Sequence, residues 1–275
     1  MARYLPHSEI SSNRPGIISS RGKTVPPNML HRQFDELGFV VRDSFFNPSE
    51  IQSLQSELNR VLLDVVPHMP SEHVFYERKT DPTTLKQLQR LHQHDPFFER
   101  LISKGPVRDL AEQLLNQSAI PQNLQYFNKP PSQGLPTPPH QDGFYFKLNP
   151  CHAVTLWLAL DPVDEQTGCL RYIRGSHRRG LRPHGGTGTL GFSQGITDFP
   201  SPQDSVSEIA CPAKPGDLIA HDALTIHRAD GNTSQSRSRR ALGFIYYGVN
   251  AKEDRAAWNQ YQHSLNQTLK QQGRI

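Results

Sequence analysis

The first half of the chain carries apolar residues at helical spacing. Asn47-Pro48-Ser49-Glu50 has the composition of a helix start, because Asn47 can cap, Pro48 fits the first turn and Glu50 can complete a capping box. The apolar positions that follow recur every three or four residues, at Ile51, Leu54, Leu58, Val61, Leu62 and Val65. This pattern predicts a helix with one buried face. Shorter patterns predict helices from Pro96 and from Pro106.

From Leu124 onward the pattern changes towards strands. One strand is predicted earlier, after a short helix end, within Gln33 to Val41. The other predicted strands all lie in this later part: Leu124 to Lys129, Gly143 to Leu148, Ala153 to Leu160, Cys169 to Ile173, Asp217 to His221 and Arg239 to Tyr247. Short strands separated by Pro- and Gly-containing turns, after a helical first part, predict a mainly β fold with flanking helices. The layout is typical of a jelly roll, the cupin-like arrangement.

The remaining segments suggest the domain organisation. Residues 1–30 are polar and form a predicted N-terminal arm, residues 31–250 a single domain, and residues 251–275 a C-terminal helix. That helix has a thin apolar stripe of Trp258, Tyr261, Leu265 and Leu269. The segment Gly175 to Pro215 is rich in Gly, Ser and Pro and only weakly periodic, which predicts a long lid or binding loop.

Composition excludes several classes of protein. Of the 275 residues, 35% are hydrophobic and 20% charged, and no apolar run approaches the roughly 18 residues of a membrane span. The net charge is +4, but the acidic residues are interspersed with the basic ones, so we expect no nucleic-acid partner. Residues 1–30 lack the apolar core of a secretory signal, which favours the cytoplasm. The widely spaced Cys151, Cys169 and Cys211 are expected to be reduced thiols.

Candidate metal ligands stand at two places in the sequence. If His140-Gln141-Asp142 begins a strand, the side chains of His140 and Asp142 project to the same face. With a second, distant histidine they would form the 2-His-1-carboxylate triad that holds iron(II) on one side and leaves positions open for co-substrate and dioxygen. His227 is the predicted third ligand, and His221 is the alternative.

A candidate co-substrate residue follows on the strand after His227. There Arg239 shares a face with Ala241 and Gly243, whereas Arg240 shares the other face with larger residues. A buried arginine bordered by small residues suits the far carboxylate of a dicarboxylate whose 2-oxo-acid end chelates the metal. This predicts 2-oxoglutarate as co-substrate.

These residues lie in segments that resemble the phytanoyl-CoA dioxygenase family, a branch of the iron(II)/2-oxoglutarate oxygenases with a double-stranded β-helix core. The similarity runs from Phe34 to about Tyr247, and its most specific segments are PPHQDGFYF, TLWLALDPVDEQTGCLRYIRGSH and HRADGNTSQSRSRRALGFIYY. The resemblance implies hydroxylation of a small organic substrate, with dioxygen consumed and succinate and CO2 released. Because Asp142 is a carboxylate where halide-using members have a small residue, it also argues for hydroxylation.

The resemblance also assigns residue roles. It implies that His140, Asp142 and His227 bind iron, that Arg239 binds 2-oxoglutarate, and that four further residues surround the co-substrate: Gln125, Trp157, Lys129 and Asn232. Two departures from the family pattern are visible: Ala229 stands where many members have Ser, and the interval from His227 to Arg239 is one residue longer. They leave open whether Arg239 or Arg240 makes the salt bridge.

Substrate contacts and rival functions complete the hypotheses. Phe144 and Tyr145 directly follow the metal ligands, and Arg178 belongs to a basic run that could steer an anionic substrate. Gly191 to Gly195 matches the G-x-S-x-G element of serine hydrolases, which would make the chain a hydrolase; that element requires a preceding strand and a following helix. A non-catalytic binding protein on the same fold is the other alternative.

Overall fold

The computed structural model describes residues 27–189 and 192–271. Most of the predicted N-terminal arm, residues 1–26, therefore lies outside the described residues. No helix in the described part of the chain is long and apolar enough to cross a membrane. The three cysteines, Cys151, Cys169 and Cys211, form no disulfide, in agreement with the predicted reduced thiols.

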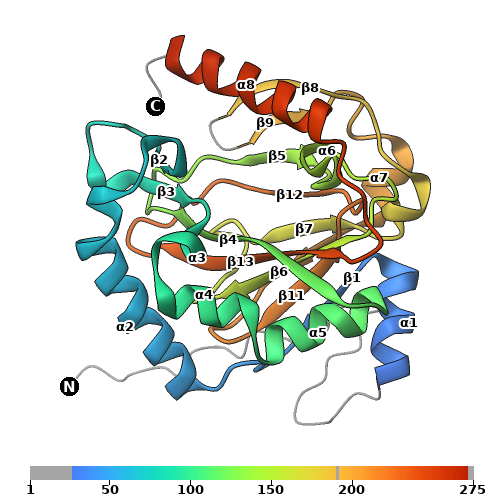
Figure 1. Ribbon diagram of the computed structural model, residues 1–275, viewed down its shortest axis with the longest axis horizontal. Coiled ribbons are helices and arrows are strands. Elements are labelled where there is room, and N and C mark those ends of the chain that lie inside the picture. Colours follow the sequence, from blue (N-terminus) through green and yellow to red (C-terminus); the bar gives the residue numbers. More distant parts are fainter. Residues whose placement is uncertain (1–26, 190–191, 272–275) are drawn as a thin grey trace, which may run out of the picture.

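Two antiparallel sheets face each other and form the centre of the molecule (Figure 1). The larger sheet has seven strands, in the order β1 (Phe39–Arg42), β11 (Leu218–Asp222), β6 (Ala153–Ala159), β13 (Arg239–Gly248), β4 (Ala119–Lys129), β3 (Leu85–Leu88) and β2 (Val74–Tyr76). The smaller sheet has four, in the order β10 (Glu208–Cys211), β7 (Leu170–Ile173), β12 (His227–Ala229) and β5 (Thr137–His140). This arrangement confirms the predicted mainly β, jelly-roll fold with flanking helices.

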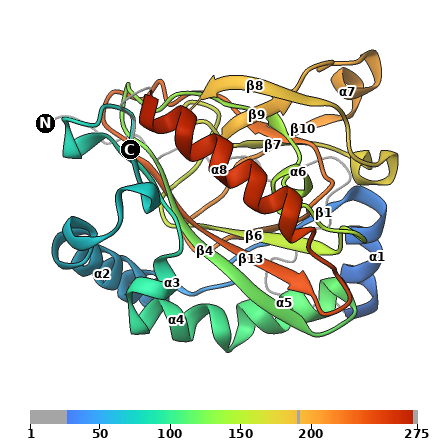
Figure 2. The ribbon, with the colours of Figure 1, turned by 45° about the horizontal axis from the view of Figure 1, so that its top comes forward.

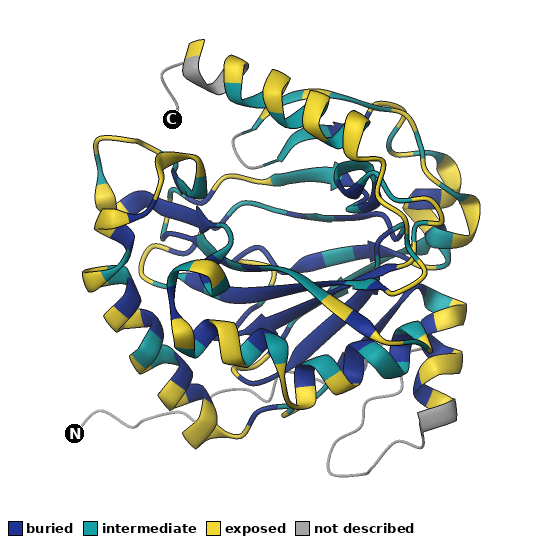
Figure 3. Cartoon of the chain, in the orientation of Figure 1, coloured by how far each residue is buried: buried dark blue, intermediate teal, exposed yellow. Residues whose placement is uncertain are grey.

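Helices cover the outer face of the larger sheet (Figures 1 and 3). They are α1 (Pro27–Leu37), α2 (Pro48–Asp64), α3 (Leu91–His94), α4 (Pro96–Ser103) and α5 (Pro106–Leu115). The capping box at the start of α2 is confirmed: the Asn47 side chain accepts from the backbone N–H of Glu50 (3.0 Å), and the Glu50 carboxylate accepts from that of Asn47 (2.7 Å). Ile51, Leu54, Leu58 and Val61 are buried, as their spacing predicted.

Side chains alternate between the two faces of the larger sheet, so that core residues lie on one face and pocket residues lie on the other. On β6, Val154, Leu156 and Leu158 belong to the apolar cluster under the helices, whereas Thr155 and Trp157 point between the sheets. On β13 the same separation puts Leu242 and Phe244 outward and Arg239 inward. One face of the sheet therefore builds the core, and the other builds the site.

The segment after Asp142 corrects the sequence prediction. Residues 143–148 were expected to form a strand, but Gly143–Phe146 forms the short helix α6, in which Tyr145 and Phe146 donate their N–H groups to the carbonyl of Asp142 (2.9 and 3.2 Å). The three successive aromatic side chains have different neighbours: Phe144 stacks on His184, whereas Tyr145 and Phe146 both line a pocket and Phe146 also packs on Tyr247. A strand would put the adjacent Tyr145 and Phe146 on opposite faces, whereas the helical turn brings both side chains to the pocket.

The segment Gly175 to Pro215 is also more regular than the predicted loop. It contains the paired strands β8 (His184–Thr189) and β9 (Phe192–Ile196), the helix α7 (Pro202–Ser207) and the edge strand β10. The hairpin β8–β9 packs beside β5 and is crossed by the C-terminal helix α8 (Arg255–Gln271) (Figure 2). The predicted helix is confirmed, although the side chain of Leu269 lies outside the described part of the structure. Short 3-10 helices occupy Val66–His68, Ser71–His73, Pro82–Thr84 and Ser176–Arg179.

Candidate metal centre and co-substrate pocket

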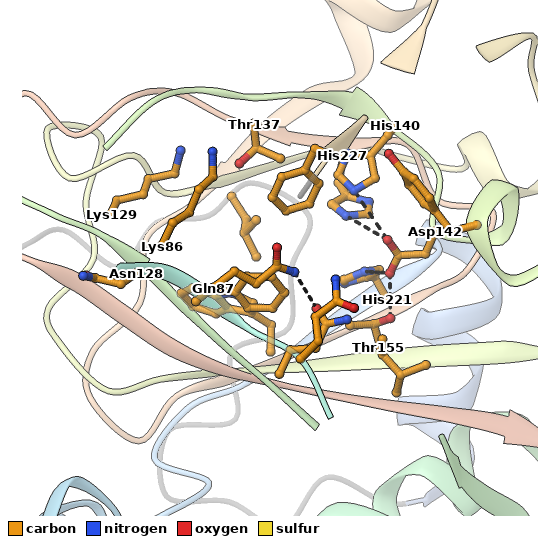
Figure 4. Close-up of a pocket in the computed structure, with 18 of the residues that line it drawn as sticks. Lys86, Gln87, Asn128, Lys129, Thr137, His140, Asp142, Thr155, His221 and His227 are labelled. Carbon is orange, nitrogen blue, oxygen red and sulfur yellow. Dashed lines mark hydrogen bonds and ion pairs between the residues drawn. The ribbon is translucent and has the colours of Figure 1, made fainter. Parts of the chain in front are cut away.

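A pocket of about 890 Å³ lies between the two sheets. The larger sheet contributes side chains from the inward-facing positions of β3, β4, β6, β11 and β13, and the smaller sheet contributes β5, β7 and β12. Figure 4 shows that His140, Asp142 and His227 lie at one end of this pocket, and that Lys86 and Lys129 lie towards the opposite end. The two ends therefore offer different chemistry.

Three potential metal ligands converge at the first end. His140 and His227 are cross-strand neighbours on β5 and β12, and Asp142 follows β5 by two residues. Asp142 Oδ1 lies 3.4 Å from His140 Nε2 and 3.7 Å from His227 Nε2, and one ligand atom from each of the three lies within 4.8 Å of the others. Since Asp142 has helical backbone angles, its side chain converges through a turn, and not through strand alternation as the sequence suggested. Two imidazoles and a carboxylate in this arrangement can hold a divalent metal.

Backbone carbonyls orient both imidazoles. The Nδ1–H of His140 donates to the carbonyl of Pro138 (2.8 Å), and that of His227 donates to the carbonyl of Thr225 (3.0 Å). Because a carbonyl oxygen can only accept, Nδ1 must carry the proton in each ring, which leaves the Nε2 lone pair directed at the centre. Burial, together with the neighbouring His140 and His221, lowers the pKa of His227 well below its ordinary value. The ring therefore stays neutral and able to bind a metal.

The second oxygen of Asp142 is held by the larger sheet. Its Oδ2 accepts from the hydroxyl of Thr155 (2.6 Å) and lies 3.2 Å from His221 Nε2, and these two residues are cross-strand neighbours on β6 and β11 (Figure 4). The other ring nitrogen of His221 lies 2.9 Å from the Tyr172 hydroxyl. His221 thus lies behind the carboxylate, away from the oxygen that faces the two imidazoles.

The charge on Asp142 is well supported. Burial alone would raise the pKa of this carboxyl, but His227, His140 and His221 outweigh burial and hold the pKa well below its usual value. A carboxylate at Asp142 and neutral imidazoles at the histidines are the protonation states that metal binding requires.

The two neighbouring arginines of β13 have opposite environments. Arg240 faces outward and makes a bidentate ion pair with Asp161, at 2.8 and 3.0 Å. Arg239 points into the pocket, only 3% exposed, with its guanidinium carbon 5.3 Å from the centre of the Trp157 ring. Among the described residues no carboxylate lies within ion-pair distance of Arg239, and its Nε has no hydrogen-bond partner. Burial lowers the pKa of Arg239 to about 10, so it stays a cation at neutral pH.

Comparison with known proteins agrees with this geometry. The sequence model of the phytanoyl-CoA dioxygenase (PhyH) family matches residues 34–241. The chain belongs to this family. It is therefore a dioxygenase of the non-heme iron, 2-oxoglutarate-dependent class, as the resemblance of its motifs indicated.

Relatives and solved structures extend the comparison. The peroxisomal phytanoyl-CoA dioxygenase of Rattus norvegicus is 25% identical over 245 residues, which cover 80% of this chain and 68% of the relative. EvdO2 from Micromonospora carbonacea var. aurantiaca, solved with 2-oxoglutarate, is 24% identical with a TM-score of 0.66 over 84% of this chain and 93% of its own. EctD from S. alaskensis, solved with bound Fe, is 21% identical with a TM-score of 0.68 over 90% and 82%. Because both solved structures are less than 25% identical to this chain, their similarity supports the fold alone.

The predicted co-substrate residues lie in two different places. Gln125 and Trp157 line the pocket on either side of Gly243, with which each is paired in the sheet. Lys129 is paired with Arg239 and donates its ammonium group to the carbonyl of Leu135. Burial, and the nearby Arg239, lower the pKa of Lys129 well below its ordinary value. These three residues surround the space beside Arg239.

Asn232 does not line the pocket. Its amide donates to the carbonyls of Lys129 (2.8 Å) and Arg237 (2.7 Å), and its oxygen accepts from the N–H of Ser234 (2.9 Å). With its donors and acceptor used in this way, Asn232 holds the loop between β12 and β13 against the end of β4, and its effect on the co-substrate is indirect.

The predicted substrate residues are also divided. Tyr145 lines the pocket, and its ring lies 6.0 Å from that of His140. Phe144 stacks on His184 outside the pocket. The prediction for Arg178 is wrong: this exposed residue pairs with Asp35 of α1 at 3.1 Å and does not line the pocket. The next arginines of the run are likewise occupied, since Arg179 and Arg182 both pair with Asp204.

Several pocket residues were missed from the sequence. Thr155 could have been found, because it lies two positions before Trp157 on the same strand face. Lys86 and Gln87, which bring a cation paired with Glu77 and an amide bonded to Gln125, could not, because the short strand β3 carries no recognisable motif.

The G-x-S-x-G match does not form a nucleophile elbow. Gly191 lies outside the described residues, and Ser193 lies within β9, where its hydroxyl is 2.9 Å from that of Tyr261 and no helix follows directly. The motif needs its serine at a strand-to-helix turn with a histidine in reach. The hydrolase alternative is therefore not favoured.

Proposed function

We propose that His140, Asp142 and His227 bind iron(II) and that 2-oxoglutarate binds beside them, so that the chain hydroxylates a small organic substrate. The observation that carries this proposal is the convergence of two oriented Nε2 atoms and one carboxylate oxygen at the end of a pocket that also contains a buried arginine, for which the described residues supply no carboxylate partner. The donor set suits a divalent metal and leaves three coordination positions open.

We further propose that Arg239 binds the far carboxylate of 2-oxoglutarate. A buried guanidinium without a carboxylate partner is costly, and a dicarboxylate would supply that partner with bidentate geometry. Lys129 can donate a hydrogen bond next to Arg239, Trp157 bounds the guanidinium on one side, and Gln125 can donate or accept across the pocket. Arg240 is excluded from this role by its ion pair with Asp161.

Iron(II) with 2-oxoglutarate would supply the oxidising power, through decarboxylation to succinate and CO2 and activation of dioxygen. The protein's own residues then have defined tasks. The backbone acceptors of His140 and His227 hold the proton on Nδ1 and turn both rings so that Nε2 faces the metal position, and Thr155 with His221 keeps Asp142 Oδ2 from rotating towards that position. The surrounding sheets exclude water from the reacting atoms.

The test is binding followed by turnover. Under anaerobic conditions, iron(II) and 2-oxoglutarate should bind together in equal amounts to the purified chain, seen by metal analysis and by the charge-transfer absorption of the chelate. In air, the loaded protein should form succinate slowly without substrate and faster with one. A protein that takes up neither iron nor 2-oxoglutarate would refute the proposal and would favour the non-catalytic alternative.

The cytoplasmic location stays a prediction. Since the rat relative is named as peroxisomal, fractionation of cells that express the native chain is the measurement that checks it.

A further inference from the structure

A second cavity adjoins the pocket that contains the candidate iron ligands. It has a volume of about 760 Å³, partly open to solvent, and lies under α8 and beside the hairpin β8–β9; we call it the outer chamber. Gln89, Gln125 and Tyr145 line both the outer chamber and the pocket between the sheets. A ligand that fills the outer chamber can therefore extend past these three side chains towards His140.

Several contacts hold the side chains at the boundary between the two spaces. The Tyr145 hydroxyl donates to the carbonyl of Gln194 on β9 (2.6 Å), and the Tyr145 ring packs against those of His140 and Tyr261 at 6.0 and 6.1 Å. The Gln125 side chain accepts from Gln87 (3.2 Å). Tyr145 therefore contacts the hairpin β8–β9, α8 and the candidate metal ligand His140. A substrate that reaches from the outer chamber to His140 would have to pass the Tyr145 ring.

The lining of the outer chamber is rich in neutral hydrogen-bonding groups. Four amides face it, from Gln89, Gln125, Gln262 and Asn266, together with the hydroxyls of Thr189 and Ser193 and four aromatic rings. The single charged residue among the described lining residues is Glu72; no lysine or arginine lines the chamber in this part of the chain. Lys147 does not line the chamber: its ammonium group stacks over Phe144 (3.8 Å) and lies 5.5 Å from the centre of the Tyr261 ring, which is itself part of the chamber lining.

These features restrict what the chamber can bind. Amide side chains both donate and accept, so they match hydroxyl and amide groups, and aromatic rings add flat apolar surfaces for ring-shaped groups. A phosphate or carboxylate would lose its hydration without gaining a cation, and Glu72 would repel it. The basic side chains of the inner pocket do not change this, because Arg239 and Lys129 lie at the proposed co-substrate position and Lys86 is paired with Glu77.

We propose that the outer chamber binds the part of the substrate that is remote from the reacting carbon, and that this part is an uncharged ring compound with several hydroxyl or amide groups, such as a sugar-like group. The proposal rests on the proposed function for the reaction itself. It separates this chain from a coenzyme A thioesterified substrate, whose phosphates would need basic residues that the described lining lacks.

The experiment compares substrate classes on the full-length, iron-loaded protein. Four sets of compounds of similar size are supplied with 2-oxoglutarate in air: neutral glycosides and polyhydroxy amides, amines, carboxylates and phosphates, and acyl-coenzyme A thioesters. Succinate formed above the substrate-free rate is the readout. We expect the neutral set to stimulate it; stimulation by the thioesters or the other anions alone would overturn the proposal.

Two variants locate the binding. Trp258→Ala and Asn266→Ala should raise KM for the stimulating compound by about tenfold, equivalent to one or two lost contacts, while the substrate-free rate and the 2-oxoglutarate Kd stay unchanged. Asn259→Ala and Gln260→Ala, exposed on the same helix, are the matched controls and should change nothing. An unchanged KM in the first two variants would refute the chamber as the binding site.

A second measurement needs neither turnover nor a known substrate. The chain has two tryptophans, so Trp157→Phe leaves Trp258 of the outer chamber as the single tryptophan fluorophore. We expect neutral acrylamide to quench it more strongly than iodide, and Glu72→Gln to reduce that difference. Equal quenching by iodide in the unmodified chamber would overturn the proposed preference for uncharged groups. Since this result does not depend on iron or 2-oxoglutarate, failure of the proposed function and failure of the chamber proposal are distinguishable.

Discussion

The two faces of the seven-stranded sheet bury different kinds of side chain. On the outer face of β13, Leu242, Phe244 and Tyr246 are fully buried under the helices in the large apolar cluster. On the inner face of the same strand, Arg239 is as deeply buried but without a carboxylate partner among the described residues, and Gly243 leaves room that the Phe127 ring fills. On the outer face, the neighbouring Arg240 is neutralised within the protein by its ion pair with Asp161.

This difference indicates which buried groups serve function. Burying a charge without a partner costs free energy, and a fold that only needed stability would neutralise it or replace it with an apolar side chain. Arg240 on the outer face is neutralised in this way, whereas the inner face keeps Arg239, Lys129 and the histidines together. The inner polar groups are therefore best explained by ligands that complete them.

The largest effect should come from the inner face at the metal end. His227→Ala should abolish stoichiometric iron binding and lower 2-oxoglutarate turnover by about a thousandfold or more, because the metal is lost. His221→Ala, the matched control, should keep one iron per chain with turnover lowered by about 10- to 100-fold, since His221 orients Asp142. Metal analysis and succinate assays check this. The reverse result would make His221 the ligand.

An outer-face substitution should affect stability alone. Leu242→Ala removes a fully buried side chain from the apolar cluster and should lower the free energy of unfolding by about 3 kcal/mol. Urea denaturation measures the loss. The Kd for 2-oxoglutarate of the folded, iron-loaded variant should match that of the parent, and a weakened Kd would show that the two faces are coupled.

Adjacent arginines give the sharpest contrast. Arg239→Ala should weaken 2-oxoglutarate binding by about 100-fold, because a bidentate charge-assisted contact is lost, with the stability of the metal-free protein changed by less than about 1 kcal/mol. Arg240→Ala should instead lower the free energy of unfolding by about 1 kcal/mol, because its half-buried ion pair is lost, while the Kd for the co-substrate stays constant. Calorimetric titration and urea denaturation of both variants are the measurements.

A pH-dependent effect on stability concerns Asp222, an outward-facing carboxylate at the end of β11. Burial raises its pKa to about 6, although the N–H of Leu224 donates to it at 2.7 Å. A carboxyl whose folded pKa exceeds its unfolded value destabilises the fold once it ionises, so stability falls as pH rises from about 4 to about 6. Asp222→Asn should therefore stabilise the protein by about 1 to 2 kcal/mol at pH 7.5, with no gain below about pH 4. A gain that is independent of pH would contradict this assignment.

Much of the fold could be read from the sequence because its signals are local. The capping box of Asn47 and Glu50 involves residues three apart, and the stripe of α2 follows from helical spacing alone. Strand alternation likewise predicted that Arg239 and Arg240 face opposite ways. The failures came where local patterns permit two outcomes: Gly143–Phe146 has strand-forming aromatics but forms a helical turn that brings Tyr145 and Phe146 to the same pocket, and the basic run around Arg178 could be read as a free patch.

The sequence by itself determined the family, the ligand types and the order in which they occur along the chain. The tertiary structure decided which partner each group meets: that His221 lies behind Asp142, that Asp161 neutralises Arg240 but nothing in the described chain neutralises Arg239, and that α8 covers an outer chamber. The physical reason is the separation along the sequence over which each kind of interaction acts. Helical and strand periodicity depend on neighbours a few residues away, whereas charge neutralisation and cavities depend on contacts between residues 79 or more positions apart, as for Asp142 with His221 and Asp161 with Arg240.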